Sequence, residues 1–244
     1  MSDEFYKLPR LYSEQALASQ ADILLPDGQA HYLRHVMRRA DGDRVRLFDG
    51  KNGEFLASLA FEGKKKVRAY VQDCIRLQQV PDARAILIFA PLAKARMDMV
   101  IEKTTELGVS DFMPVLTNRT EHRKVNPQRL QAQIIEACEQ AERLTLPRLH
   151  DLVTLPQLIA RWVEADRPNI QWCCERDYAD RQPLSAQSAG DQAYLVGPVG
   201  GFDEDECALL RQASHVVPIS LGDAVLRAET ASIMCLSAFK LSSL

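Results

Sequence analysis

The segment with the clearest capacity for chemistry is LVGPVGGFDEDE, residues 195–206. An apolar run ends there at Gly197, and two more glycines precede an acidic stretch that begins at Asp203. Glycines let a backbone approach a ligand closely, so that its N–H groups can donate hydrogen bonds to that ligand. Asp203 is a good helix cap, and the carboxylates after it suit the positive end of a helix dipole. The spacing alone fits a ligand loop and a plain strand-to-helix turn equally well.

The acidic stretch would repel a phosphate, and the segment has neither a P-loop lysine nor a GxGxxG pattern. These absences count against an α/β enzyme that binds a nucleoside triphosphate or a dinucleotide.

A second apolar run ends in glycine within ISLGDAVLRAETA, residues 219–231. Arg227, Glu229 and Thr230 cluster where the following helix is expected to begin. Arginine is always charged and carries a rigid fork of donors, which suits a phosphate or a developing oxyanion. An ordinary Arg–Glu ion pair beside a helix cap is the alternative interpretation. Two glycine-ended strands near one sheet edge are more informative together than either is alone.

The basic residues near the N-terminus form a different kind of candidate site. Three arginines (Arg34, Arg38 and Arg39) share one short predicted helix, Arg10 precedes the first predicted strand, and Lys64–Lys66 occupy a predicted hairpin. Such a set can contact phosphates with little reading of base sequence, and it can also be a merely solvated face. His31 and His35 lie four residues apart, but no acidic ligand set accompanies them, so we expect no metal site.

Composition narrows the class of protein. The 244 residues are 46% hydrophobic and 26% charged, which is typical of a globular protein and excludes disorder, collagen and coiled coil. No apolar run is long enough for a membrane span, and the charged N-terminus lacks the core of a signal peptide. The six cysteines are scattered, which favours reduced thiols and a cytoplasmic protein over disulfides or zinc.

The net charge of −3 conceals a gradient along the chain. Residues 1–80 contain 13 Lys and Arg against 11 Asp and Glu, whereas the remainder contains 17 against 22. The front part is therefore the better candidate for contact with a polyanion. It is also predicted to be mostly β: strands at 44–50, 54–61 and 67–77 follow one helix over 28–39, whose apolar face is Leu33, Val36 and Met37.

The rest of the chain alternates strands with helices, which predicts an α/β domain with an open parallel sheet. Expected strands are 85–91, 111–116, 169–174, 193–197 and 216–222; expected helices are 94–107, 127–143, 155–165, 203–213 and 226–242. Ligands of such sheets bind beyond the carboxyl ends of the strands. The loops after Pro91, Leu116, Cys174, Gly197 and Leu221 are therefore the places to search.

Together these segments resemble the ribosomal RNA small subunit methyltransferase E family, which belongs to the SPOUT class. The resemblance rests on LVGPVGGF and LGDAVLRAETA, on KARMDMVIEKTTELGV and EACEQAERLTLP before them, and on LPRLY and HYLRHVMRRADGDRVRLFDG at the front. It covers nearly the whole chain. It implies a PUA-like RNA-binding domain at 1–75, a SPOUT methyltransferase domain with a trefoil knot at 76–244, and a homodimer.

The resemblance also implies a reaction, the methylation of N3 of one uridine in 16S rRNA with S-adenosyl-L-methionine as donor and without a metal. The substrate would be free 16S rRNA or the assembled small ribosomal subunit. The catalytic residues it implies are Arg227, Glu229 and Thr230. The cofactor residues it implies are Leu116, Cys174, Glu175, Gly197, Pro198, Gly200, Gly201, Ser220, Leu221, Gly222, Val225 and Leu226. The implied RNA-binding residues are Arg10, Arg34, Arg38, Arg39, Lys94, Arg96, Arg119 and Arg143.

On this hypothesis Arg227 stabilises negative charge that develops on the uracil oxygens. Glu229 either accepts the N3 proton or orients Arg227. The chain departs from the family pattern at Val199, where glutamate is usual, and at Asp223-Ala224, where Pro-Arg is usual. The alternatives are therefore a non-catalytic RNA-binding relative and a methyltransferase for another RNA, such as tRNA.

Overall fold

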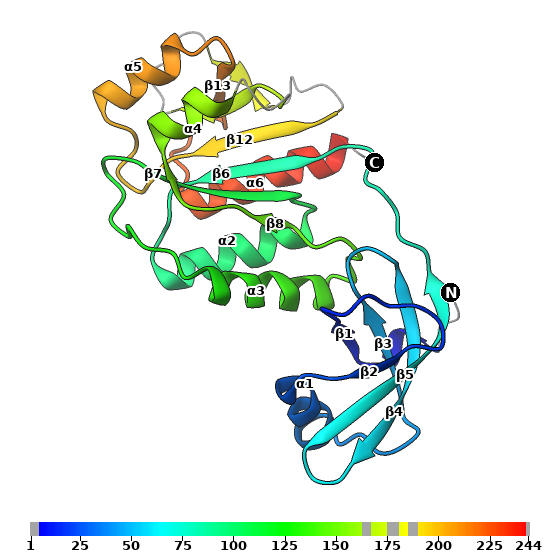
Figure 1. The fold of residues 1–244 in the computed structure, drawn as a ribbon. Coiled ribbons are helices and arrows are strands. Elements are labelled where there is room, and N and C mark those ends of the chain that lie inside the picture. Colours follow the sequence, from blue (N-terminus) through cyan, green and yellow to red (C-terminus); the bar gives the residue numbers. More distant parts are fainter. Residues whose placement is uncertain (1–4, 163–166, 175–180, 185–189, 243–244) are drawn as a thin grey trace. The chain divides into compact units, whose positions relative to one another are not determined.

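A computed structural model describes residues 5–162, 167–174, 181–184 and 190–242. The chain forms two compact units. The first consists of Met1–Val80 and Cys138–Leu146, and the second consists of Pro81–Ala137 and Pro147–Leu244 (Figure 1). The sequence predicted a boundary near residue 75 but gave no sign that residues 138–146 belong with the N-terminal segment.

The first unit is built on a five-stranded sheet in the order β1-β3-β4-β5-β2. Its strands are β1 (Arg10–Tyr12), β2 (Asp22–Leu24), β3 (Arg44–Phe48), β4 (Glu54–Glu62) and β5 (Lys66–Arg76). The three long strands match the sequence prediction and pair antiparallel. The two short ones were missed, because three residues carry too little periodicity to recognise.

The single helix predicted over 28–39 is two short pieces and ends earlier. After the 3₁₀ turn η1 (Phe5–Lys7), the α-helix α1 (Asp27–His31) continues into the π-helical turn η2 (Tyr32–Val36). Leu33 is fully buried, as expected, but Val36 is 62% exposed. The predicted apolar face is therefore wrong at Val36, because the π turn changes the rotation per residue from the α-helical period on which the prediction relied.

A buried cluster of charges lies inside the first unit. The Glu54 side chain has no exposed surface, and the guanidinium groups of Arg10 and Arg46 pair with it. Arg10 also donates hydrogen bonds of 2.7 Å to the carbonyl oxygens of Cys138 and Arg143. Because Arg10 is only 7% exposed, it has no free surface from which to contact RNA. We therefore correct that expectation and interpret Arg10 as a structural residue that ties β1 to the 138–146 segment.

The second unit contains a sheet whose recorded strand pairings are all parallel, in the order β11-β13-β10-β12-β6-β7-β8, with β9 beside β7. The predicted strands are confirmed as β6 (Ala85–Phe89), β7 (Asp111–Leu116), β10 (Ile170–Cys173), β12 (Gln192–Val196) and β13 (Val216–Ser220). Three two-residue strands were not predicted: β8 (Arg148–Leu149), β9 (Val153–Thr154) and β11 (Gln182–Pro183).

The predicted helices of this region are also confirmed, and most are shorter than expected. They are α2 (Lys94–Glu106), α3 (Pro127–Gln140), α4 (Leu155–Trp162), α5 (Glu204–Gln212) and α6 (Ala228–Ser242). Helices α2 and α6 pack together on one face of the sheet, and α4 and α5 lie on the other (Figure 1). The trefoil knot stays a prediction.

Candidate active site

A cavity of about 500 Å³ lies at the carboxyl edge of the parallel sheet. It lies at the carboxyl ends of three neighbouring strands, β13, β10 and β12, which is where the sequence predicted ligand sites of an open sheet. The lining residues are Arg96, Cys173, Cys174, Arg181, Val196, Gly197, Pro198, Val199, Gly201, Phe202, Leu221, Gly222, Ala224, Val225, Leu226, Arg227, Ala228 and Ala231. The two glycine-ended turns therefore meet at one cavity.

The loop after β12 needs glycine at its first position. A Cβ atom on Gly197 would lie 2.7 Å from the Phe202 ring, too close for any side chain unless the ring moved. Phe202 itself packs edge-on against Trp172 of β10, with ring centroids 5.9 Å apart. The glycines farther along adopt left-handed backbone, with φ of +69° at Gly201 and +103° at Gly222. The shape of the two turns therefore depends on glycine at these positions, where a residue with a Cβ atom would clash or be strained.

A capping box begins helix α5 and fixes the same loop from its other end. Asp203 accepts a hydrogen bond from the backbone N–H of Glu206 at 2.9 Å, and the Glu206 carboxylate accepts one from the N–H of Asp203 at 3.1 Å. The bond from the Glu206 N–H, followed by a side-chain bond from Asn118, lowers the pKa of Asp203. Asn118, which follows β7, donates to both carboxylates. The predicted cap is confirmed, and it binds the loop after β7 to the loop after β12.

Cys174 contributes its thiol to the cavity wall but is not a nucleophile at neutral pH. Burial raises the pKa of this thiol to about 11, against a smaller lowering by the charge of Arg181. The Cys174 Sγ donates to the carbonyl oxygen of Ile219 at 3.3 Å, which ties the end of β10 to β13. A neutral thiol used this way supports the shape of the cavity, and covalent catalysis is disfavoured.

Three arginines, Arg96, Arg181 and Arg227, bring positive charge to the cavity. Arg96 Nε lies 3.7 Å from Glu229 Oε1. Glu229 is itself buried, and its Oε2 has no hydrogen-bond partner among the described residues. The sequence hypothesis linked Glu229 to Arg227, whereas the recorded ion pair of Glu229 is with Arg96. The exposed Arg227 therefore faces the cavity without this partner.

Most, but not all, of the predicted cofactor residues come together here. Cys174, the glycine turns and the Leu221–Leu226 loop line the cavity. The lining does not include Leu116, Gly200 or Ser220, and neither does it include the predicted catalytic residues Glu229 and Thr230. Glu175 lies outside the described residues. Arg96, which was predicted for RNA, lines this cavity, and Phe202 and Arg181 were not predicted at all. Phe202 follows Gly200 and Gly201 directly, and that position next to the glycine loop was the signal that could have found it.

The predicted RNA-binding residues are dispersed. In the first unit Arg34 donates to the carbonyl of Gly63 at 3.0 Å, Arg38 is exposed, and Arg39 is half-buried. In the second unit Lys94 is exposed at the start of α2, and Arg119 donates to the carbonyl of Gly200 at 2.8 Å. Burial lowers the pKa of Arg143, which belongs to the segment that packs with the first unit. Contact of these residues with RNA stays a prediction.

Residues 79–240 match the RNA methyltransferase domain family, and residues 25–70 match the RNA methyltransferase PUA domain family. A protein of Rickettsia conorii named ribosomal RNA small subunit methyltransferase E is 31% identical over 96% of both chains. The chain belongs to the ribosomal RNA small subunit methyltransferase E family.

Two solved structures extend the relation to ligands. The methyltransferase E of Neisseria gonorrhoeae, solved bound to S-adenosylmethionine, is 26% identical, superposes with a TM-score of 0.83, and covers 96% of this chain and 97% of its own. A Legionella pneumophila protein solved with the cofactor SAM is 28% identical, has a TM-score of 0.86, and covers 97% and 98%. The architecture of this methyltransferase E family member is therefore α/β, a SPOUT-type sheet with an N-terminal PUA-like unit.

The departures from the family pattern lie at the cavity rim. Val199 and Ala224 both line the cavity, and Val199 is 61% exposed. Asp223 is also exposed. Because these side chains face solvent, the substitutions leave no buried group without a partner. The methyltransferase E cavity keeps its glycine turns and Arg227 despite them.

Within the described ranges, no group of three or more His, Cys, Asp or Glu side chains is arranged to hold a metal ion. None of the described helices combines the length and apolar character that crossing a membrane requires.

Proposed function

We propose that this protein methylates N3 of one uridine in the 16S RNA of the small ribosomal subunit, with S-adenosylmethionine as methyl donor. The observation that carries the proposal is the convergence of two glycine turns and Arg227 on one cavity, in a chain of the methyltransferase E family. The proposal also includes a cytoplasmic location and a homodimer. The substrate is either free 16S rRNA or the assembled subunit.

The cavity fits the cofactor in size and in chemistry. Its volume of about 500 Å³ lies within the range of roughly 300–1,000 Å³ that is usual for small-molecule sites. Apolar side chains such as Leu221 and Leu226 suit the adenine ring, backbone groups of the glycine turns suit its polar edge, and an arginine suits the carboxylate of the methionine part. When bound, S-adenosylmethionine supplies a methyl group on a positively charged sulfur, which makes that carbon electrophilic.

The acceptor requires more from the protein, because N3 of uridine carries a proton and is a poor nucleophile until it loses that proton. The proton passes to solvent water, and the negative charge left on the base spreads onto the two carbonyl oxygens of the uracil ring. Arg227, exposed at the cavity wall, donates to these oxygens and stabilises the anion. Glu229 is a positioning residue on this scheme, since it holds Arg96 against the same cavity. Alignment of the base with the donor supplies much of the remaining rate.

The homodimer has support from helix α6. Ala231, Cys235 and Leu236 bury one face of it within the unit, while Met234 is 39% exposed and Leu241 is 72% exposed. A second copy of the protein would cover that apolar surface.

The test replaces Arg227 with alanine and measures methyl transfer to 16S rRNA together with cofactor binding by calorimetry. Loss of one donor to a developing oxyanion lowers kcat by about 10²–10³-fold. Cofactor affinity should change little if the main role of Arg227 is toward the uracil. Arg161→Ala is the matched control, because Arg161 is exposed on α4 and does not line this cavity. A variant with normal kcat contradicts the assigned role, and a wild-type protein that binds no cofactor contradicts the proposed function.

A further inference from the structure

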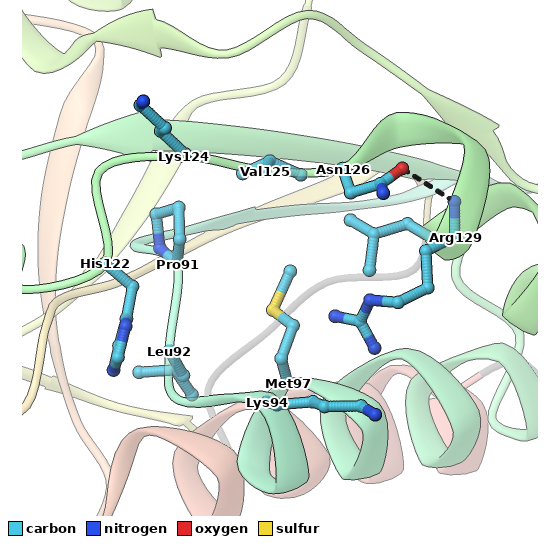
Figure 2. Close-up of a pocket in the computed structure, with 10 residues that line it drawn as sticks. Pro91, Leu92, Lys94, Met97, His122, Lys124, Val125, Asn126 and Arg129 are labelled. Atoms are coloured by element: carbon cyan, nitrogen blue, oxygen red, sulfur yellow. Dashed lines mark hydrogen bonds between the residues drawn. The ribbon is translucent and has the colours of Figure 1, made fainter.

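A second, smaller cavity of about 270 Å³ lies along the same carboxyl edge of the sheet (Figure 2). It is formed by the segment after β6 and by the long loop from β7 to α3. Its floor is apolar and buried, with Pro91, Leu92, Met97 and Leu130. Its rim is basic, with Lys94, His122, Lys124 and Arg129. The combination of an apolar floor and a cationic rim is the surface that one nucleotide of a nucleic acid requires.

We call this smaller cavity the basic pocket, and the net charge of the side chains that line it is positive. No aspartate or glutamate in the described part of the chain lines it. The carboxylate of Asp98 accepts a hydrogen bond from Arg129 and also interacts with the charge of Lys94. Lys94 and Lys124 remain exposed to solvent, so their ammonium groups can reach a ligand. A phosphodiester would therefore find two exposed lysines and an arginine held by Asp98.

The N-termini of helices α2 and α3 add partial positive charge at the same place. Helix α2 begins at Lys94, and its N-cap, Ala93, has no side chain that could satisfy the first N–H groups. Helix α3 begins at Pro127 directly after Asn126, whose side chain accepts from the N–H of Arg129 at 3.1 Å (Figure 2). Neither helix has an acidic residue in its first turn. The dipoles of both helices therefore add to the attraction that the side chains exert on an anion.

Size decides what part of a ligand the pocket can hold. Its volume of about 270 Å³ falls just below the range of roughly 300–1,000 Å³ that is usual for a whole small-molecule ligand. The cavity assigned to the cofactor is almost twice as large. A pocket of this size and charge suits one unit of a polymer, whose other units continue into solvent.

The pocket is coupled to the larger cavity through two shared elements. The first turn of α2 places Lys94 at the basic pocket and Arg96 at the larger cavity. The loop after β7 bonds to the cofactor loop through Arg119 and the carbonyl of Gly200, and its later residues, His122 to Asn126, line the basic pocket. A ligand in the pocket therefore lies one helical turn from the cavity in which the methyl group is transferred.

We propose that this pocket binds a phosphodiester of the RNA substrate, on a nucleotide that neighbours the methylated uridine. Lys94 and Lys124 contact the phosphate, and the sugar or base of that nucleotide lies against Met97 and Leu92. The proposal rests on the proposed function, and it adds His122, Lys124 and Arg129 to the residues that position RNA. It assigns RNA binding to the second unit as well as to the basic N-terminal unit.

The experiment compares wild-type protein with the double variant Lys94→Gln/Lys124→Gln. Binding of a 16S rRNA transcript is measured across a series of salt concentrations, cofactor binding by calorimetry, and methyl transfer as kcat and KM. Lys103→Gln is the matched control, because Lys103 is an exposed lysine at the other end of the same helix and lines neither cavity. Lys94→Arg/Lys124→Arg, which keeps both charges, should restore binding if the interaction is electrostatic.

Removal of one lysine that neutralises a phosphate should reduce the slope of log K against log salt by about 0.7 for a single strand. The double variant should therefore have a slope smaller by about 1.4, a raised KM for RNA, and unchanged kcat and cofactor affinity. The proposal is overturned if cofactor binding is intact and the slope and KM equal those of Lys103→Gln. It is also overturned if inorganic phosphate binds more weakly to the variant while RNA binding stays the same. Absence of cofactor binding or methyl transfer in the wild type would instead contradict the proposed function.

Discussion

The two cavities of the second unit share one sheet edge but are built from different kinds of residue. The larger one receives the end of β10 and the loops after β12 and β13, and its shape depends on glycines and on the packed ring of Phe202. The smaller one receives the loops after β6 and β7, and its rim consists of long cationic side chains. Backbone turns give a fixed surface for a ligand of constant shape. Exposed lysines adapt to a flexible polyanion and bind mostly through charge. The carboxyl edge of the sheet therefore holds a rigid site, the larger cavity, and an adaptable site, the basic pocket.

Cys174 offers the largest expected effect and a direct probe of the rigid site. Because burial raises its pKa from near 9 to about 11, the fraction of thiolate at neutral pH should be about a hundredfold below that of an ordinary thiol. Alkylation of Cys174 by iodoacetamide should be correspondingly slow, and should quicken about tenfold per pH unit up to pH 11. Peptide mass spectrometry follows the reaction, with the exposed Cys74 as internal reference.

S-adenosylmethionine should slow the alkylation of Cys174 further, because it would occupy the cavity that this thiol lines. Alkylation at an unchanged rate in saturating S-adenosylmethionine would break the assignment of this cavity to the cofactor. Fast labelling of Cys174 at pH 7 would contradict the burial of its thiol.

Gly197→Ala should have the next largest effect. The added Cβ would lie 2.7 Å from Phe202, which Trp172 holds in place. Overpacking of this kind costs roughly 1–3 kcal/mol, which corresponds to about 5–150-fold in cofactor affinity if the strain falls on the binding-competent turn. Calorimetry measures the loss. Gly28→Ala is the control, since a Cβ there meets nothing within 4 Å.

RNA binding by Gly197→Ala should stay within about twofold of wild type, because the basic pocket contains no glycine on which its shape depends. A parallel loss of RNA and cofactor affinity would show that the two cavities act as one.

The two cavities also differ in how far the sequence could predict them. Periodicity and apolar runs predicted the strands that build the sheet, and the glycines and Asp203 marked the rigid loop, because each of these signals is local. The partners of charged residues were not predictable in this way. Glu229 pairs with Arg96 from a helix far away in sequence, and Arg10 bonds to carbonyl groups of the 138–146 segment, which begins in the last turn of α3.

The basic pocket was only partly visible in the sequence. Lys94 was selected, but through a family resemblance and not through its place beside a cavity. Lys124 and His122 belong to the run EHRK shortly before the start of α3. Such a run is as typical of a solvated loop as of a binding site. What distinguishes the two interpretations is the apolar floor beneath the charges, and Leu92, Met97 and Leu130 form it only after two helices have packed.

Asp98→Asn should have the smallest effect, and this effect should be an increase in RNA affinity. Asp98 is the carboxylate that offsets Arg129, so removing its charge should make the basic pocket more attractive to RNA. A partly exposed charge contributes less than about 1 kcal/mol, so RNA affinity should rise about two- to fivefold, with a steeper salt dependence and unchanged cofactor binding. Weaker RNA binding would contradict the proposed role of the pocket.

The same variant should lose stability in a pH-dependent way. Burial alone would raise the pKa of Asp98, but the hydrogen bonds from Gln133 and Arg129 and the charge of that arginine hold it below its ordinary value. A carboxylate whose pKa is lower in the folded state stabilises the protein above its unfolded pKa of about 3.9, and this contribution disappears as the pH falls through the folded value. Urea unfolding should therefore show Asp98→Asn to be less stable than wild type at pH 7, with the difference shrinking toward pH 3. A difference that persists undiminished at pH 3 would mean that Asp98 acts through packing, and that Arg129 does not need its charge to stay at the rim.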